Sequence, residues 1–215
     1  MQKLVILGTS GNSLEILEAV LDSHGADTSS RFSVEGFLDD DPNKWGQDIL
    51  GYPVIGPLSQ AHRIDDVKFI NGIGSTNSFK RKPEIIAGLG IPDEKFATII
   101  HPSATVSRFA KIGVGTIVLQ NAVIGTRVQI GRHVQILPLS VVSHDSQVDD
   151  FATIAGGVSV SGYVHLGRAC YIGSAAAIRN NVHIGSEALV GMGSVVLNDV
   201  AAQTVVAGVP AVERK

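Results

Sequence analysis

An aliphatic residue stands at every sixth position through most of the second half of the chain. The series is Val106, Ile112, Val118, Ile124, Ile130, Ile136, Val142, Val148, Ile154, Val160, Leu166, Ile172, Ile178, Ile184, Val190 and Val196. The residue two positions before each member is small or β-branched, from Ala104 to Ser194. A period of six fits neither an α-helix nor an ordinary strand. It is typical of a hexapeptide solenoid and predicts a parallel β-helix.

The period also predicts which residues are neighbours. Three hexads make one triangular coil, with strands about 4.8 Å apart, so residues 18 positions apart stack directly. This spacing places Gly162 over His144 and His183 over His165, with Gln129 and Gln147 extending the second column. Known hexapeptide coils wind left-handed, which is an exception to the usual right-handed crossover. We therefore expect about five left-handed coils.

Residues 1–98 lack this period and alternate between apolar strands, polar turns and helical spacing. The pattern predicts strands at Lys3–Leu7, Phe32–Leu38 and Val67–Ile70, a helix after the first turn, and a second helix over Pro83–Leu89. Strand, turn, helix and strand in repetition indicate a small α/β unit with a parallel sheet. We expect a Rossmann-like domain over residues 1–98 and a β-helix domain over residues 99–215.

Three polar or glycine-rich turns, residues 8–13, 39–41 and 71–77, follow the predicted strands. A βαβ unit binds its ligand at the carboxyl ends of the strands, and the first turn can offer backbone N–H groups to a phosphate. That turn contains Gly8 and Gly11 but no complete G-x-G-x-x-G fingerprint. A nicotinamide enzyme is therefore disfavoured, and a mononucleotide or nucleotide sugar is compatible. Turns that only reverse the chain are the alternative.

Composition excludes several classes of protein. The chain has 17 Lys and Arg against 20 Asp and Glu and no basic stripe, so we expect no nucleic-acid partner. No segment approaches the ~18 apolar residues of a membrane span, and we expect a cytoplasmic protein. Cys170 is the only cysteine, which rules out an internal disulfide. It falls at a small position of the hexad, so we expect buried filler, with a reactive thiol as the alternative.

Seven histidines are candidates for chemistry: His24, His62, His101, His133, His144, His165 and His183. His165 and His183 share a corner, but no third ligand joins them and no H-x-x-x-x-H pair occurs, so we expect no metal. His144 differs because Asp145 follows it and Gly162 leaves space above it. A carboxylate beside a histidine can fix the tautomer and raise the basicity of the ring, as in a general base. A polar dipeptide at a solenoid corner is an equal alternative.

Six motifs run through both halves: Leu7-Gly8-Thr9-Ser10-Gly11, Gly36-Phe37-Leu38-Asp39-Asp40-Asp41-Pro42, Gly72-Ile73-Gly74, His101-Pro102-Ser103-Ala104, Ser143-His144-Asp145 and Gly208-Val209-Pro210-Ala211. In these motifs the chain resembles the bacterial nucleotide-sugar N-acetyltransferases of the hexapeptide-repeat family, relatives of the sialic-acid O-acetyltransferases. The resemblance implies acetyl-CoA as co-substrate and a homotrimer as the working unit. It implies the amine of a nucleotide-linked amino sugar, of the 4-amino-4,6-dideoxy type, as the acceptor.

The resemblance also implies roles for single residues. It makes His144 the general base, supported by Asp145. It places the nucleotide sugar on Gly8, Ser10, Gly11, Asn12, Asp39, Asp40, Gly72, Ile73, Gly74 and Asn77. It places acetyl-CoA, in a groove between neighbouring subunits, on Thr153, Gly162, Ser174, Gly191, Met192, Gly208, Val209 and Pro210.

Three departures from the family pattern bear on the substrates. Asn12 stands where many relatives have a histidine, and Leu137 stands where many have an asparagine. Both positions face the acceptor in the family, so we expect either a different acceptor sugar or different contacts with it. The tail has Val212 and Glu213 directly after Pro-Ala, where a basic residue is usual.

Direct attack on the thioester is the expected mechanism, since no Cys or Ser pairs with His144 to form an acyl-enzyme. The nearest alternative is O-acetylation of sialic acid or a related sugar. A non-catalytic trimeric scaffold that binds nucleotide sugars is the alternative from another class, because a solenoid does not by itself imply catalysis. A sugar nucleotidyltransferase needs a longer basic loop, and the turn at 8–13 has no Lys or Arg.

Overall fold

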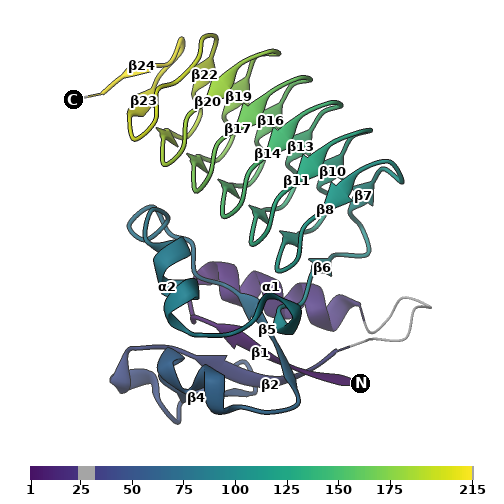
Figure 1. Cartoon of the computed structure of the whole chain (residues 1–215), viewed down its shortest axis with the longest axis vertical. Coiled ribbons are helices and arrows are strands. Elements are labelled where there is room, and N and C mark those ends of the chain that lie inside the picture. Colours follow the sequence, from purple (N-terminus) through teal and green to yellow (C-terminus); the bar gives the residue numbers. More distant parts are fainter. Residues whose placement is uncertain (24–31, 215) are drawn as a thin grey trace.

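The computed structural model describes residues 1–23 and 32–214, so His24 lies outside the described residues. These residues form an N-terminal α/β part and a long C-terminal coil that lies along it (Figure 1). The first strand of the coil, β6 (Ile99–Ile100), follows directly on the predicted boundary at residue 98. Among the described residues, no helix is long and apolar enough to cross a membrane.

The N-terminal part is built on one five-stranded sheet in the order β3-β4-β2-β1-β5. Its strands are β1 (Gln2–Leu7), β2 (Phe32–Leu38), β3 (Asp48–Ile49), β4 (Tyr52–Gly56) and β5 (Val67–Asn71). All pair in parallel except β3, which runs antiparallel to β4. The three predicted strands are present. The β3–β4 hairpin was not predicted, because its turn contains Leu50 and Gly51 rather than the Asn-Gly or Asp-Gly that usually marks such a turn.

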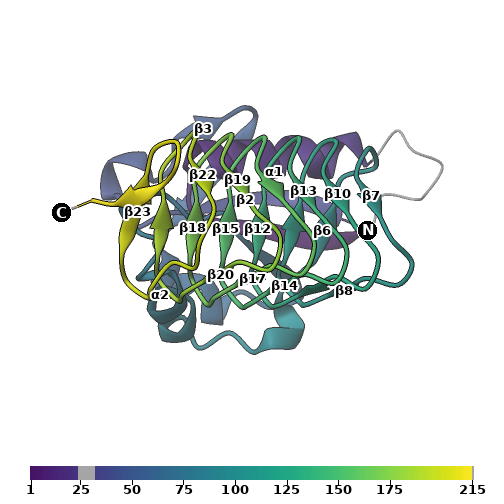
Figure 2. The same ribbon diagram turned by 90° about the horizontal axis from the view of Figure 1, so that it is seen from above.

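Helix α1 (Gly11–Asp22) and helix α2 (Lys82–Gly88) lie on opposite sides of the sheet (Figure 2). The cause is the alternation of side chains along β1. Leu4 and Ile6 pack with α1, whereas Val5 and Leu7 belong to the cluster that contains Ile86 of α2. Three short 3₁₀ helices complete this part: η1 (Pro42–Lys44), η2 (Leu58–Arg63) and η3 (Asp93–Lys95).

The coil is a parallel β-helix with three faces. The docking face, which meets the N-terminal part, holds β6, β9 (Ile117–Val118), β12 (Gln135–Ile136), β15 (Thr153–Ile154), β18 (Tyr171–Ile172), β21 (Leu189–Val190), β23 (Val205–Ala207) and β24 (Val212–Glu213). The valine face holds β7 (Thr105–Val106), β10 (Val123–Ile124), β13 (Val141–Val142), β16 (Ser159–Val160), β19 (Ala177–Ile178) and β22 (Val195–Val196). The histidine face holds β8 (Lys111–Ile112), β11 (Gln129–Ile130), β14 (Gln147–Val148), β17 (His165–Leu166) and β20 (His183–Ile184).

The predicted spacing of 18 residues sets the register of all three faces. Val123 pairs with Val141, and His165 pairs with His183. The second residue of most coil strands points inward and builds one continuous aliphatic core from Val118 to Val206. At the corners, every sixth residue from Gly115 to Gly193 has a φ between 51° and 72°. Only three of these fourteen residues are glycine, so the stacked backbone holds ordinary residues, Asp145 included, in a left-handed conformation.

Two hydrophobic clusters join the two parts of the chain. One contains Ile117 of β9 and Leu119 together with residues of β1 and α1. The other contains Phe151 and Ala169 together with residues of β1, β5 and α2. Leu137 packs against the first cluster, which explains an apolar residue there. The docking face is therefore largely covered within one chain, while the other two faces are open.

Candidate active site

His144 lies at the corner between the valine face and the histidine face, directly after β13. We call this corner, with the residues stacked on 143–145, the His144 corner. The Nδ1 atom of His144 lies 2.8 Å from Oδ2 of Asp145. The imidazole is 53% exposed, whereas the carboxylate is 16% exposed. A largely buried carboxylate thus holds one nitrogen of an accessible ring.

The charge on Asp145 decides which nitrogen of His144 carries the proton. Hydrogen bonds from Arg127 and then from His144 lower the pKa of Asp145 to about 2. The carboxylate is therefore ionised near neutral pH and can only accept a hydrogen bond, which favours the tautomer of His144 with a proton on Nδ1. This leaves the lone pair on Nε2, the tautomer that a general base requires.

Gly162 lies above the imidazole, as the 18-residue spacing predicted. A side-chain carbon at position 162 would lie 2.6 Å from Cε1 and 2.8 Å from Nε2 of His144. The ring of Tyr163 meets the imidazole edge-on, with centroids 5.3 Å apart. Only glycine at 162 leaves room for the ring in this position.

The three predicted turns of the N-terminal part meet at the carboxyl edge of the sheet. The N–H of Gly8 donates to the carbonyl of Leu38 at 2.7 Å, and the N–H of Gly72 donates to the carbonyl of Leu7 at 2.9 Å. The hydroxyl of Ser10 donates to the carbonyl of Gly72 at 3.2 Å. Helix α1 begins here at Gly11, with no side chain of the described residues capping its N-terminus.

Asp39 organises the turn after β2. Its carboxylate accepts from the backbone N–H of Thr9 and of Asp41, each at 3.0 Å, and from Nζ of Lys44 at 3.2 Å. Burial opposes ionisation of Asp39, but these bonds and one from the Thr9 hydroxyl outweigh it and lower its pKa. Asp40 instead accepts from the N–H of Leu58 at 2.9 Å, at the start of η2.

Gln135 on the docking face is a site residue that the sequence did not reveal. Its side chain is 1% exposed, and its amide donates to the carbonyls of Asn71 at 2.8 Å and of Ile73 at 3.1 Å. The amide of Asn12 donates to the carbonyl of Gly74 at 3.3 Å and to Oε1 of Gln135 at 3.4 Å. Asn12, Ile73, Gly74 and Gln135 thus form one network, whereas Asn77 is exposed beyond it.

Ser13 is a second such residue. It is fully buried beneath Gly8 and Gly72, and its hydroxyl has no hydrogen-bond partner among the described atoms. A side-chain carbon at Gly72 would collide with that hydroxyl. The carboxyl edge therefore holds an unpartnered donor beside a free helix N-terminus.

All of the residues expected to hold acetyl-CoA except Thr153 lie at or beside two separate corners. Ser174, Gly191 and Met192 lie at the corner between the docking face and the valine face, which we call the Met192 corner. Gly208, Val209 and Pro210 follow β23 at the same end of the docking face. Gly162 belongs to the His144 corner. The valine face separates the two groups within one chain.

Thr153 does not lie in a groove open to the coenzyme, contrary to expectation. It lies on the docking face with no exposed surface, and its hydroxyl accepts from Nζ of Lys82 at 2.9 Å. Lys82 is itself fully buried, and burial lowers its pKa to about 7. The expectation is wrong because α2 covers this part of the docking face.

Cys170 and the other described histidines lie apart from the His144–Asp145 pair. Cys170 has no exposed surface, and burial raises the pKa of its thiol to about 12, which rules out the reactive alternative. His165 Nε2 lies 2.9 Å from Asp149 Oδ2, and His133 stacks on Phe151 with centroids 4.9 Å apart. His101 lies 3.0 Å from Asp22, and His62 is exposed. Over residues 1–23 and 32–214, no group of three His, Cys, Asp or Glu could hold a metal.

Comparison with known proteins gave relatives along the whole length of the chain. No family model matches the sequence. It is 35% identical over 135 residues to the GDP-perosamine N-acetyltransferase of Escherichia coli O157:H7, a match that covers 53% of this chain. That match spans about three fifths, 61%, of the curated relative.

Solved structures resemble the whole chain. The acetyltransferase domain of PglB from Neisseria gonorrhoeae is 28% identical with a TM-score of 0.85, and the match covers 100% of both chains. The same domain has been solved in complex with acetyl coenzyme A, at 27% identity and 99% coverage of both chains. PerB from Caulobacter crescentus, in complex with CoA and GDP-perosamine, has the same fold, with 24% identity, a TM-score of 0.85 and coverage of 99% of this chain and 97% of PerB.

Proposed function

We propose that this chain, whose homologues are bacterial sugar N-acetyltransferases of the hexapeptide-repeat type, transfers the acetyl group of acetyl-CoA to the amine of a nucleotide-linked amino sugar. The observation that carries the proposal is the geometry of His144. Its Nδ1 lies 2.8 Å from the ionised Asp145, and its imidazole is 53% exposed, with Gly162 above Nε2. An accessible neutral imidazole with a fixed tautomer is suited to remove a proton from an attacking amine.

The chemical step needs no further protein nucleophile. As the sugar amine attacks the thioester carbonyl, the C–N bond forms and Nε2 of His144 accepts a proton from the nitrogen. The C–S bond then breaks, and the proton passes from His144 to the leaving thiolate of CoA. Asp145 stabilises the transient imidazolium, since its carboxylate stays ionised.

The carboxyl edge of the sheet is the proposed site of the nucleotide. The uncapped N-terminus of α1 attracts the diphosphate, and the unpartnered hydroxyl of Ser13 lies beside it. Lys44, whose Nζ is 2.9 Å from the hydroxyl of Thr9, adds a positive charge to the same edge. Asp40 shapes the turn after β2 through its bond to Leu58. The proposed lining of the nucleotide site is Gly8, Ser10, Gly11, Asn12, Asp39, Asp40, Gly72, Ile73, Gly74 and Asn77.

Acetyl-CoA fits between two copies of the chain. The Met192 corner offers an exposed and mostly apolar edge, on which Met192 is 78% and Val209 73% exposed, suited to the pantetheine arm. Beyond it, the guanidinium of Arg214 approaches Gly208 and supplies a cation for phosphate. His144 and Gly162 are on the far side of the valine face, so a second copy brings the two corners together.

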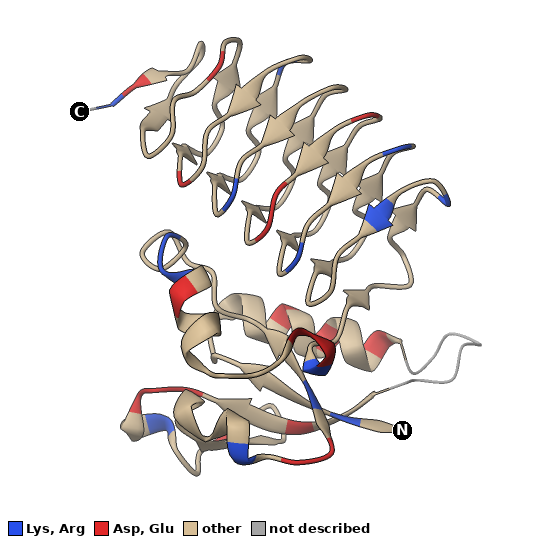
Figure 3. Cartoon of the chain, viewed as in Figure 1, with Lys and Arg blue, Asp and Glu red and all other residues tan. Residues whose placement is uncertain are grey.

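The valine face supports a homotrimer as the working unit. Its outward residues are Thr105, Val123, Val141, Ser159, Ala177 and Val195, none of them charged. Figure 3 shows that the charged residues of the coil gather mainly at its corners. The N-terminal part of the same chain covers the docking face, away from His144. The nucleotide edge and the base of one active site therefore come from different copies.

Steady-state kinetics with His144→Ala test the proposal. GDP-perosamine is the first acceptor to assay, followed by UDP- and dTDP-linked 4-amino-4,6-dideoxy sugars. We expect the wild type to release CoA thiol only with an amino sugar, and the variant to lose about 10²–10⁴-fold in kcat with unchanged nucleotide binding.

His165→Ala is the matched control, because His165 is also a half-exposed histidine paired with an aspartate at 2.9 Å. It should keep wild-type turnover. Near-wild-type turnover of His144→Ala would refute the assignment of the base. Acetylation of a free sialic acid, together with no thermal shift on adding GDP, UDP or dTDP, would instead show the O-acetyltransferase alternative.

A further inference from the structure

We propose that Arg127 is a positioning residue for the acetyl transfer, which holds Asp145 in the orientation that fixes the tautomer of His144. Arg127 lies one coil before Asp145, 18 residues earlier in the sequence. Its Nε donates to Oδ1 of Asp145 at 2.6 Å and its Nη2 donates to Oδ2 at 2.8 Å. The inference rests on the proposed function, since it assigns a role around the same base.

The carboxylate of Asp145 is clamped from two directions. Arg127 binds both of its oxygens in the fork geometry of a bidentate pair, and Oδ2 also accepts from Nδ1 of His144 at 2.8 Å. Asp145 itself has a left-handed backbone with a φ of 59°, and its N–H donates to the carbonyl of Thr126 at 3.0 Å. The backbone is thus fixed by stacking, and the side-chain rotation is fixed by Arg127.

The Asp145 side chain could rotate if Arg127 did not hold both of its oxygens. Without Arg127, the Asp145 side chain can turn toward water, because the His144 corner is open to solvent. His144 would then lose the acceptor that keeps its proton on Nδ1, and part of the population would carry the proton on Nε2. That tautomer has no lone pair on the nitrogen that meets the substrate.

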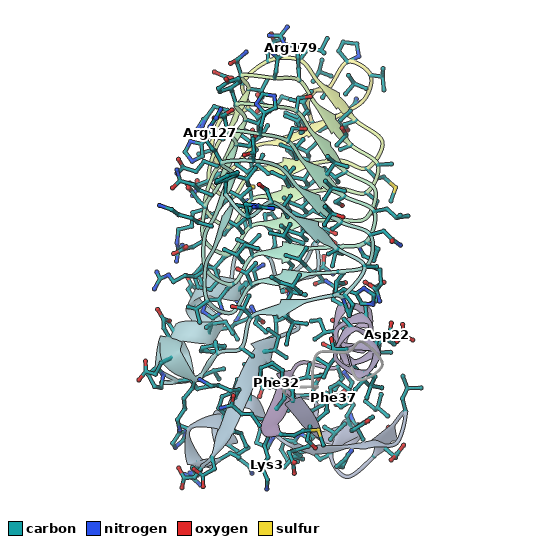
Figure 4. All side chains as sticks on the ribbon, turned by 90° about the vertical axis from the view of Figure 1, so that its right-hand side faces the viewer. Lys3, Asp22, Phe32, Phe37, Arg127 and Arg179 are labelled. Carbon is teal, nitrogen blue, oxygen red and sulfur yellow. The ribbon has the colours of Figure 1, made fainter. Side chains whose placement is uncertain are left out.

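Arg127 lies where its replacement should affect the His144 corner and leave the rest of the fold intact. Figure 4 shows Arg127 on the β-helix, far from Phe37 and Lys3 of the N-terminal sheet. Its side chain is 66% exposed, so it fills no core and its loss leaves no cavity. The ring of Tyr163 meets the imidazole edge-on, and Gly162 has no side chain that could replace Asp145 as the acceptor from Nδ1.

Kinetics of a double-mutant cycle test the role of Arg127. Arg127→Ala should lower kcat about 10-fold, within the range of coupled neighbours, and leave both KM values within about twofold. Arg127→Lys keeps one charge without the fork and should restore part of kcat. In an Asp145→Asn background, Arg127→Ala should change kcat by less than about twofold, because the clamped carboxylate is already gone. Arg108→Ala, an exposed arginine at the same corner two coils before His144, is the control and should behave as the wild type.

Nitrogen-15 correlation spectra of the imidazole give a readout that does not depend on turnover. The signals of His144 are assigned by their loss in His144→Gln. We expect the wild type and Arg108→Ala to show the Nδ1–H tautomer, and Arg127→Ala to show a rising share of the Nε2–H tautomer.

Three results would overturn the proposal: an equal loss of kcat in both backgrounds, a rise in KM in place of a fall in kcat, or an unchanged tautomer in Arg127→Ala. If no amino sugar is acetylated by the wild type, the proposed function fails, and the spectra alone still decide whether Arg127 sets the tautomer.

Discussion

Replacing Gly162 by alanine tests whether the position of the His144 ring controls turnover. The new carbon would lie 2.6 Å from Cε1 of His144, whereas two carbons reach their best separation at about 3.5 Å. The ring must therefore move by about 1 Å, which also breaks the 2.8 Å contact between Nδ1 and Asp145. A misplacement of about 1 Å can cost about 10²-fold in rate, and we expect a loss of that size in kcat.

The stability of the Gly162→Ala protein should hardly change. Gly162 does not have a positive φ, so alanine fits its backbone conformation. The displaced His144 ring is half-exposed and can move into solvent, so the melting temperature should stay within about 2 °C of the wild type. Gly88→Ala in α2 is the control, because a side-chain carbon there would meet no atom within 4 Å and the residue lies outside both corners of the coil. The assay follows CoA thiol release with GDP-perosamine. Wild-type kcat in Gly162→Ala, or an equal loss in Gly88→Ala, would refute the reasoning.

Two further predictions concern buried polar residues at the docking face. Burial lowers the pKa of Lys82 to about 7, so the unfolded chain binds more protons above that pH, and the free energy of unfolding should rise with pH by up to about 1.4 kcal/mol per unit. Lys82→Met should flatten this rise between pH 7 and pH 9 in urea unfolding, and equal slopes would contradict it. Gln135→Leu deprives the carbonyls of Asn71 and Ile73 of their donor and should destabilise by about 2–4 kcal/mol. It should raise KM for the nucleotide sugar more than KM for acetyl-CoA, whereas Gln129→Leu on the open histidine face should change neither.

The features that sequence predicts well here are those that repeat. The six-residue period places each inward aliphatic of the coil, because every corner turns the chain in the same way. The same spacing stacks Gly162 on His144, and the structure shows this contact directly. The three parallel strands of the N-terminal part are also found where the apolar runs predict them.

The sequence could not show which face of the coil is covered. An outward position of a hexad predicts exposure, yet Gln135 and Thr153 are both buried because the N-terminal part lies over the docking face. Lys82, in the helix that covers Thr153, is a lysine with no exposed surface, and nothing in its local pattern indicates burial. Long-range packing decided these positions, and it corrected the expected role of Thr153.

The three-face geometry also limits how the length of this chain can change. Insertion of six residues after Asp145 would leave every buried aliphatic pointing inward, but it would rotate all later coils by one face. Met192, now at the Met192 corner, would then stand at the His144 corner. A deletion of six would move it to the third corner, where the histidine face meets the docking face. Only a change of 18 residues returns each corner to its place. Gain or loss of single hexads would therefore keep the fold and destroy the site, whereas whole coils can be gained or lost with the corners still aligned.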